Sequence, residues 1–142
     1  MTAYRRILAA IDLTGDSRAV AARACELGAP GGEVRLLHVI EFVPIEPMSD
    51  SLVPVMQIDD QLLSRAQAQI QALARELKLP AEAATVEVGS AKLEILRHAR
   101  AQRSDLIVLG CRERHGLSIL LHRTEDTVLH GAPCDVLAVR VR

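Results

Sequence analysis

The segment from Leu106 to Arg142 decides the fold predicted for this chain. It reads Leu-Ile-Val-Leu-Gly at residues 106–110, a polar Cys-Arg-Glu-Arg-His at 111–115, an amphipathic stretch at 116–131, and Ala-Pro-Cys-Asp-Val-Leu-Ala-Val-Arg at 132–140. This order predicts a buried strand, a loop, a helix and a final strand. Glycines in such a strand-loop-helix edge let backbone N–H groups converge on a phosphate. The place for a phosphate loop is present here, but most of its glycines are missing.

Strand and helix patterns alternate through the rest of the chain as well. Continuous apolar runs are typical of parallel strands that are covered on both faces, and apolar residues at the helical period indicate amphipathic helices. The predicted strands are Arg5–Asp12, Glu33–Ile40, Thr85–Val88, Leu106–Leu109 and Asp135–Val141, and the predicted helices are Arg18–Leu27, Asp59–Lys78, Ala91–Arg103 and Leu117–His130. The alternation predicts an α/β fold of one domain, residues 1–142, with a parallel five-stranded sheet and helices on both faces.

Several residues carry the details of this prediction. We expect Gly28 and the pair at 31–32 to stop the first helix before the second strand begins. Leu62 and Leu93 follow the helical period and are expected on apolar helix faces. Glu41–Ile58, with Pro44, Pro47 and Pro54, predicts a long irregular connection.

Composition excludes several classes of function. The formal net charge is -1, and Tyr4 and Phe42 are the two aromatic residues, so the chain has neither the basic face nor the stacking platforms of a nucleic-acid-binding protein. No apolar run reaches the length of a membrane span, and the first apolar run is too short for a signal peptide. The three cysteines form no Cys-x-x-Cys motif. We expect a cytoplasmic protein that binds neither nucleic acid nor membrane.

Five segments together resemble the universal stress protein family, and the likeness covers nearly the whole chain. They are Ile7–Asp12, Val34–Val39, Asp105–Gly110, Gly116–Ser118 and Ala132–Arg140. The resemblance implies the strand order 3-2-1-4-5 and a homodimer formed through the last strand. It also places Asp12, Val39 and Gly110 around one crevice at the switch point between the first and fourth strands.

The resemblance also bears on nucleotide binding. Family members that bind ATP carry Gly-x-x-Gly, nine residues, and then Gly-Ser or Gly-Thr. Here Gly110 holds the first position, Glu113 replaces the second glycine, and Arg123-Thr124 stand at the last pair. Glu113 adds a negative charge, which at ~4–6 Å from a phosphate costs roughly 3–4 kcal/mol before screening. The chain is therefore similar to the kind that does not bind ATP.

Arginines keep the same loop locally positive, so the alternative of an ATP-binding chain stays open. If ATP is the cofactor, the resemblance implies contacts from Asp12, Val39, Gly110, Arg112 and Thr124; otherwise no cofactor is expected. A purely structural role for Asp12, holding the turn between Thr14 and Ser17, is the favoured interpretation.

The cysteines, the histidines and the possible catalytic groups give weaker indications of function. Cys111 is either a redox-sensing thiol or an inert small residue, and the second interpretation is favoured because no base accompanies it. The histidines form no His-x-x-x-His pair, so no metal site is predicted, and His38 and His98 are interpreted as structural. No nucleophile, base and orienting group can be assigned together, so we expect no enzyme.

Together these observations predict a cytoplasmic, non-catalytic homodimer of the universal stress type. It would act in the stress response through an unknown protein partner and carry a degenerate nucleotide site. The alternative is a regulator that binds ATP or another adenine nucleotide with weak or no ATPase activity. A nucleotide hydrolase is the weakest of the three interpretations.

Overall fold

A computed structural model describes residues 3–41, 60–112, 128 and 130–141 of the chain. The strands of this part are β1 (Tyr4–Ala10), β2 (Gly28–Glu41), β3 (Ala84–Gly89), β4 (Leu106–Arg112) and β5 (Asp135–Val141). The helices are α1 (Ser17–Leu27), α2 (Asp60–Glu76) and α3 (Ala91–Ala101), with a 3-10 turn at Ala81–Ala83. The predicted connection over Glu41–Ile58 and most of the predicted helix Leu117–His130 lie outside the described residues.

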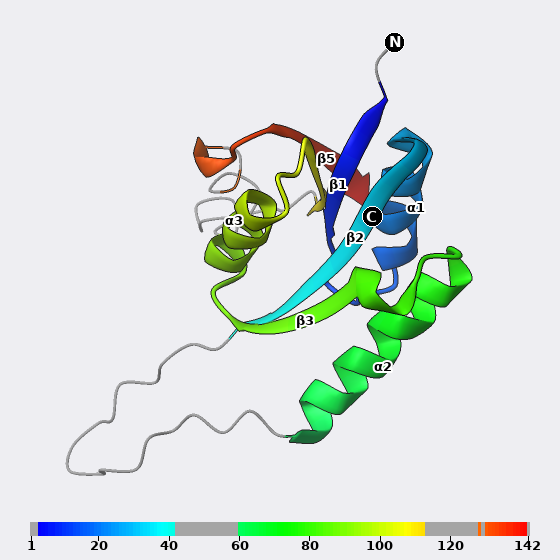
Figure 1. Ribbon diagram of the computed structural model, residues 1–142. Coiled ribbons are helices and arrows are strands. Elements are labelled where there is room, and N and C mark those ends of the chain that lie inside the picture. The colour runs from blue at the N-terminus through cyan, green and yellow to red at the C-terminus, as the bar shows by residue number, and fades with distance from the viewer. Residues whose placement is uncertain (1–2, 42–59, 113–127, 129, 142) are drawn as a thin grey trace, which may run out of the picture.

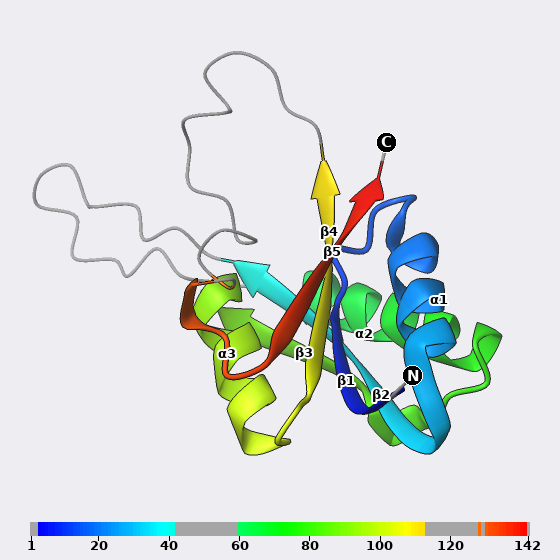
Figure 2. The same ribbon diagram turned by 90° about the horizontal axis from the view of Figure 1, so that it is seen from above.

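The five strands form one sheet in the order β3-β2-β1-β4-β5, and every neighbouring pair is parallel. Helices α1 and α2 cover one face, and α3 covers the other (Figure 1). The ends of β4 and β5 point the same way when the molecule is seen from above (Figure 2). The predicted α/β class, parallel sheet and strand order are confirmed.

The alternation of side chains along β1 explains why this strand lies at the centre. Ile7 and Ala9 point to the cluster beneath α1 and α2, and Leu8 points to the cluster beneath α3. All three are buried. Burial on both faces accounts for the continuous apolar run in the sequence.

Gly28 ends α1 as predicted, and β2 begins at this residue and runs through the glycines at 31–32. Tyr4 pairs with Gly28 and Arg6 with Glu33, so the ladder contains an irregularity between these pairs. Gly31 has a φ of 78°, and a Cβ on Gly32 would lie 3.0 Å from the carbonyl oxygen of Arg5. Glycine is needed here for a bulge and for close approach of two backbones, rather than as a helix stop alone.

Helices α2 and α3 end earlier than predicted. Lys78 and Arg103 have φ values of 60° and 53°, which lie in the left-handed region. Leu79 N–H donates to the Ala74 carbonyl over 2.8 Å, and Ser104 N–H donates to the Ala99 carbonyl over 2.9 Å. These bonds close Schellman-type helix ends, in which the left-handed residue is usually glycine. A lysine and an arginine in that role give no sequence signal for the end of the helix.

Two predicted apolar contacts are wrong. Leu62 is 47% exposed and Leu93 is 61% exposed, although both follow the helical period. Their helices pack through other residues, namely Ala66, Ile70, Leu73 and Ala74 of α2 and Ile95, Leu96 and Ala99 of α3.

Candidate functional site

The candidate site is a crevice of about 390 Å³ at the carboxyl ends of β1, β2 and β4. Its walls come from these strand ends and from the first turns of α1 and α3. The described lining residues are Ala10, Ile11, Asp12, Asp16, Ser17, Val20, Leu37, His38, Val39, Glu41, Ala91, Ile95, Leu109, Gly110 and Val141. The volume falls in the range of small-molecule sites, and the position is the topological switch point of the sheet.

Asp12 follows β1 and organises the turn that leads into α1. Its Oδ1 accepts hydrogen bonds from Thr14 N–H at 3.0 Å, from Thr14 Oγ1 at 2.7 Å and from Ser17 Oγ at 3.1 Å. Ser17 is buried. This is the geometry of an Asx turn, in which a carboxylate replaces a backbone acceptor. The carboxylate thus serves the turn at the same time as it lines the crevice.

Gly110 lies within β4, opposite Val139 of β5. A Cβ at this position would lie 3.3 Å from Cγ2 of Val20 and 3.7 Å from the methyl groups of Val141. The missing side chain therefore lets α1 pack closely on β4 at the floor of the crevice.

His38 fixes the second strand to the end of the first. Its Nδ1 lies 2.7 Å from the carbonyl oxygen of Ile11. A carbonyl oxygen can only accept, so Nδ1 carries the proton and Nε2 is the atom with the free lone pair in the neutral ring.

Carboxylates lie near both helix N-termini that reach the crevice, and one of them binds a helix N–H group directly. Glu41 Oε1 accepts the backbone N–H of Ala91, the first residue of α3, at 3.2 Å. Asp16 is the N-cap residue of α1, and Asp12 bonds to the turn just before it. The described lining residues thus include three acids and one histidine, and neither lysine nor arginine is among them.

Three of the five residues predicted around a nucleotide line this crevice: Asp12, Val39 and Gly110. Arg112 is the last residue of β4, where it pairs with Val141. The structure extends β4 three residues beyond its predicted end, so that Gly110, Cys111 and Arg112 belong to the strand rather than to a loop. Thr124, Glu113 and Arg123 lie outside the described residues.

Two cysteines, Cys25 and Cys134, have thiols with raised pKa values. Burial, followed by the charge of Glu26, raises the pKa of Cys25. Burial, followed by the charges of Asp135 and Asp105, raises the pKa of Cys134. A raised pKa leaves little thiolate at neutral pH, so neither thiol has the character of a reactive cysteine.

Sequence reasoning missed two features of this region. The sequence pattern places Glu41 at the start of the connection Glu41–Ile58. In the structure Glu41 ends β2, and its carboxylate caps α3. Glu87, Glu94 and His98 form a compact cluster on β3 and α3. The signal for the cluster was present in the spacing Glu94-x-x-x-His98, since residues four apart share one face of a helix.

Among the described residues, no helix has the length and apolar character needed to cross a membrane.

The universal stress protein family model matches residues 3–140 of the chain. The chain is 35% identical over 144 residues to universal stress protein A homolog 2 of Coxiella burnetii, covering 100% of this chain and 99% of that protein. It is also 35% identical over 138 residues to universal stress protein A homolog 1 of the same organism, covering 96% of each.

Solved structures share the fold at lower identity. Universal stress protein UspA of Lactobacillus plantarum aligns with a TM-score of 0.66 and 21% identity, over 99% of this chain and 100% of that one. A universal stress protein solved in complex with cAMP aligns with a TM-score of 0.62 and 17% identity, over 99% and 100% of the two chains. A further protein, solved for a structure-based assignment of biochemical function, aligns with a TM-score of 0.76 and 21% identity over 99% of each chain. The sheet order, the switch-point crevice and these matches lead to one conclusion: the chain belongs to the universal stress protein family.

Proposed function

We propose that this chain is a cytoplasmic, non-catalytic protein of the stress response that acts through protein partners as a homodimer. In this proposal the crevice does not hold ATP with high affinity. At most it takes the uncharged, nucleoside-sized part of a ligand.

The observation that carries the proposal is the charge of the crevice wall. Asp12, Asp16 and Glu41 line it, and the described lining residues supply no lysine or arginine to offset them. A helix N-terminus attracts phosphate because its N–H groups lack partners. At α3 the first of these groups already binds Glu41, so a phosphate would have to displace a carboxylate.

The residues that follow β4 in the sequence support the same conclusion. Glu113 and Arg123 stand where ATP-binding relatives carry glycine. Neither residue adopts positive φ as readily as glycine, and Glu113 repels phosphate. Arg112 and Arg114 attract anions, but charge alone does not rebuild a cradle of N–H groups.

The edge position of β5 supports the homodimer. β5 lies at one end of the sheet and pairs with β4 on a single side. An apolar edge strand is prone to pair with a second chain. In a two-fold dimer the two copies of β5 would meet antiparallel, each using the same residues.

A second candidate function is an adenine-nucleotide-binding regulator. Two observations favour it: Asp12, Val39 and Gly110 line one crevice, and a structural relative was solved in complex with cAMP. Native mass spectrometry of gently purified protein distinguishes the two candidates. The proposal predicts protein without bound nucleotide, whereas a stoichiometric mass increment equal to an adenine nucleotide would support the second candidate.

A further inference from the structure

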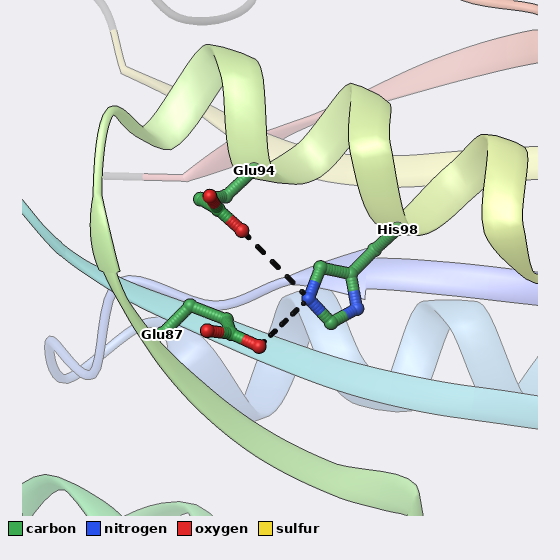
Figure 3. A group of neighbouring side chains, drawn as sticks. All are labelled: Glu87, Glu94 and His98. Atoms are coloured by element: carbon green, nitrogen blue, oxygen red, sulfur yellow. Dashed lines mark hydrogen bonds and ion pairs between the residues drawn. The ribbon is translucent and has the colours of Figure 1, made fainter.

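A cluster of three potential metal ligands lies on the α3 side of the sheet, outside the crevice. Glu87 comes from β3, and Glu94 and His98 come from successive turns of α3. Figure 3 shows the two carboxylates and the imidazole ring pointing toward one another. His98 Nε2 lies 3.1 Å from Glu87 Oε1 and 4.0 Å from Glu94 Oε2. One ligand atom from each residue lies within 4.8 Å of the other two.

We propose that Glu87, Glu94 and His98 form a binding site for a divalent first-row metal ion, with Zn²⁺ as its best-fitting occupant. Carboxylate oxygen and imidazole nitrogen are both common zinc ligands, with bonds of about 2.0–2.2 Å. Ligand atoms at the corners of a tetrahedron of that size are about 3.4 Å apart. The two measured separations from His98 bracket this value, and side-chain rotation would bring three ligand atoms that lie within 4.8 Å of one another to this spacing. Three protein ligands leave the fourth position to water.

The position of Arg97 is an independent sign that this place accepts a cation. Its Nη2 lies 2.5 Å from Glu94 Oε2, 3.4 Å from Glu87 Oε1 and 3.3 Å from His98 Nε2. A single positively charged nitrogen therefore contacts all three proposed ligand atoms. The guanidinium marks where the two carboxylates concentrate negative charge, and it competes with a metal ion for that place.

Arg97 can leave this position at low cost. Its side chain is 57% exposed, so the guanidinium has an open path into solvent. Ion pairs that solvent reaches contribute little to stability. The ligands themselves are more sheltered, at 13% exposure for His98 and 20% for Glu94. Metal binding would thus exchange a weak surface ion pair for three bonds in a partly enclosed site.

The second ring nitrogen of His98 also has a neighbour that suits a metal ligand. Gln102 Nε2 lies 3.4 Å from His98 Nδ1, one helical turn further along α3. A metal on Nε2 requires the proton on Nδ1, and a histidine ligand usually donates that proton to a polar group nearby. A half-turn of the Gln102 amide places its oxygen at this position as the acceptor.

The site would join β3 to α3 beside the crevice. Glu87 is opposite Val39 in the β2–β3 ladder, and α3 begins at Ala91; both Val39 and Ala91 line the crevice. A bound ion would hold this wall in place and release the guanidinium of Arg97 to the surface.

Isothermal titration of chelator-treated, full-length protein with Zn²⁺ tests the proposal. We expect one ion per chain in the wild type and no heat of binding with Mg²⁺, which prefers oxygen ligands. His98→Ala should weaken Zn²⁺ binding by at least about tenfold, as should Glu87→Gln, which removes a ligand charge from a more exposed position. Arg97→Ala should strengthen it, because the competing cation is gone.

The matched control is His130→Gln, which removes an exposed histidine from outside the cluster. This change should leave the affinity unaltered. Glu87→Gln keeps the test valid if His98→Ala does not fold. The proposal is overturned if wild-type protein shows no saturable Zn²⁺ binding below millimolar concentration. It is equally overturned if binding survives both His98→Ala and Glu87→Gln, since the ion would then lie at the cysteines or another histidine.

Discussion

His38 reaches across the central strands and donates from Nδ1 to the carbonyl oxygen of Ile11 over 2.7 Å. This bond joins β2 to Ile11, which follows the last residue of β1 and directly precedes Asp12. It fixes the floor of the crevice while Asp12 and Glu41 fix its walls through hydrogen bonds to the backbone at the starts of α1 and α3. The crevice is thus shaped by polar groups that already have partners within the protein. Such a site is formed in advance, but its negative charges oppose polyphosphate.

Replacement of Asp12 tests the role of its carboxylate in the turn. Asp12→Ala removes the acceptor of three hydrogen bonds, one of them from the buried Ser17 hydroxyl. We expect a loss of about 1–3 kcal/mol in the free energy of unfolding, measured by urea denaturation. Asp12→Asn keeps an oxygen acceptor in the same place and should cost clearly less. Equal losses in the two variants would show that the charge, rather than the turn geometry, matters.

The hydrogen bond from Tyr4 to Asp135 predicts an abnormal tyrosine titration. Tyr4 Oη donates to Asp135 Oδ2 over 2.8 Å, and this bond, ahead of burial and the charges of Asp135 and Asp105, raises the Tyr4 pKa above 10.0. Tyr4 is the single tyrosine and there is no tryptophan, so ultraviolet absorbance follows this group alone. The midpoint should lie above that of a free tyrosine, and Asp135→Ala should move it back.

The same hydrogen bond predicts that stability falls as the pH becomes strongly alkaline. The folded-state pKa of Tyr4 is raised above the unfolded value, so the neutral phenol is the form that the fold favours. Its contribution is present below the unfolded pKa and is lost as the pH rises through the folded pKa. Melting temperatures of wild type and Tyr4→Phe should therefore converge at strongly alkaline pH. A difference between the two melting temperatures that widened with rising pH would contradict this prediction.

Lys78 offers a route to higher stability. Its φ of 60° places a non-glycine residue in the left-handed region after α2. That conformation costs an L-residue roughly 1–2 kcal/mol. Glycine adopts it without this strain, although glycine loses more conformational entropy on folding, which offsets part of the gain. Lys78→Gly should raise the free energy of unfolding by about 0.5–1 kcal/mol in chemical denaturation. Lys92→Gly, inside α3, is the matched control and should lower it by a similar amount.

The proposed dimer interface predicts the effect of a charge on β5. Val139 lies in this edge strand, opposite Gly110 of β4. Val139→Lys should turn a wild-type dimer into a monomer in light scattering, because an edge lysine disfavours pairing of strands between chains. Because Val139 also packs against the core, circular dichroism is needed as a control and should show that the variant keeps its fold. Wild-type protein that is monomeric at micromolar concentration would contradict the proposed interface.

The sequence predicted the sheet more fully than the site, for physical reasons. Apolar runs such as the one in β1 depend on burial on both faces, which a single sequence reveals, and the strand order followed from the family resemblance. The ends of elements were less predictable. Lys78 and Arg103 end helices in a conformation usually left to glycine, while β2 begins five residues before its predicted start at Glu33 and includes the glycines at 31–32.

The crevice could be foreseen only in part. Asp12, Val39 and Gly110 were expected together because the family resemblance implies a strand order that brings them to one switch point, and all three line the crevice. The cap that Glu41 places on α3 joins residues 50 positions apart, and no local pattern encodes such a contact. The contact between Glu87 and His98 likewise depends on how α3 packs on β3, which periodicity alone does not give.

The most direct test of the account is calorimetric titration of wild-type protein with ATP. The acidic crevice, Glu113 and Arg123 together predict no saturable binding at sub-millimolar ATP. The double change Glu113→Gly with Arg123→Gly should improve the affinity more than either single change, because it restores two glycines of the phosphate loop and removes one negative charge. A dissociation constant in the micromolar range for the wild type would contradict the account and favour the nucleotide-binding regulator.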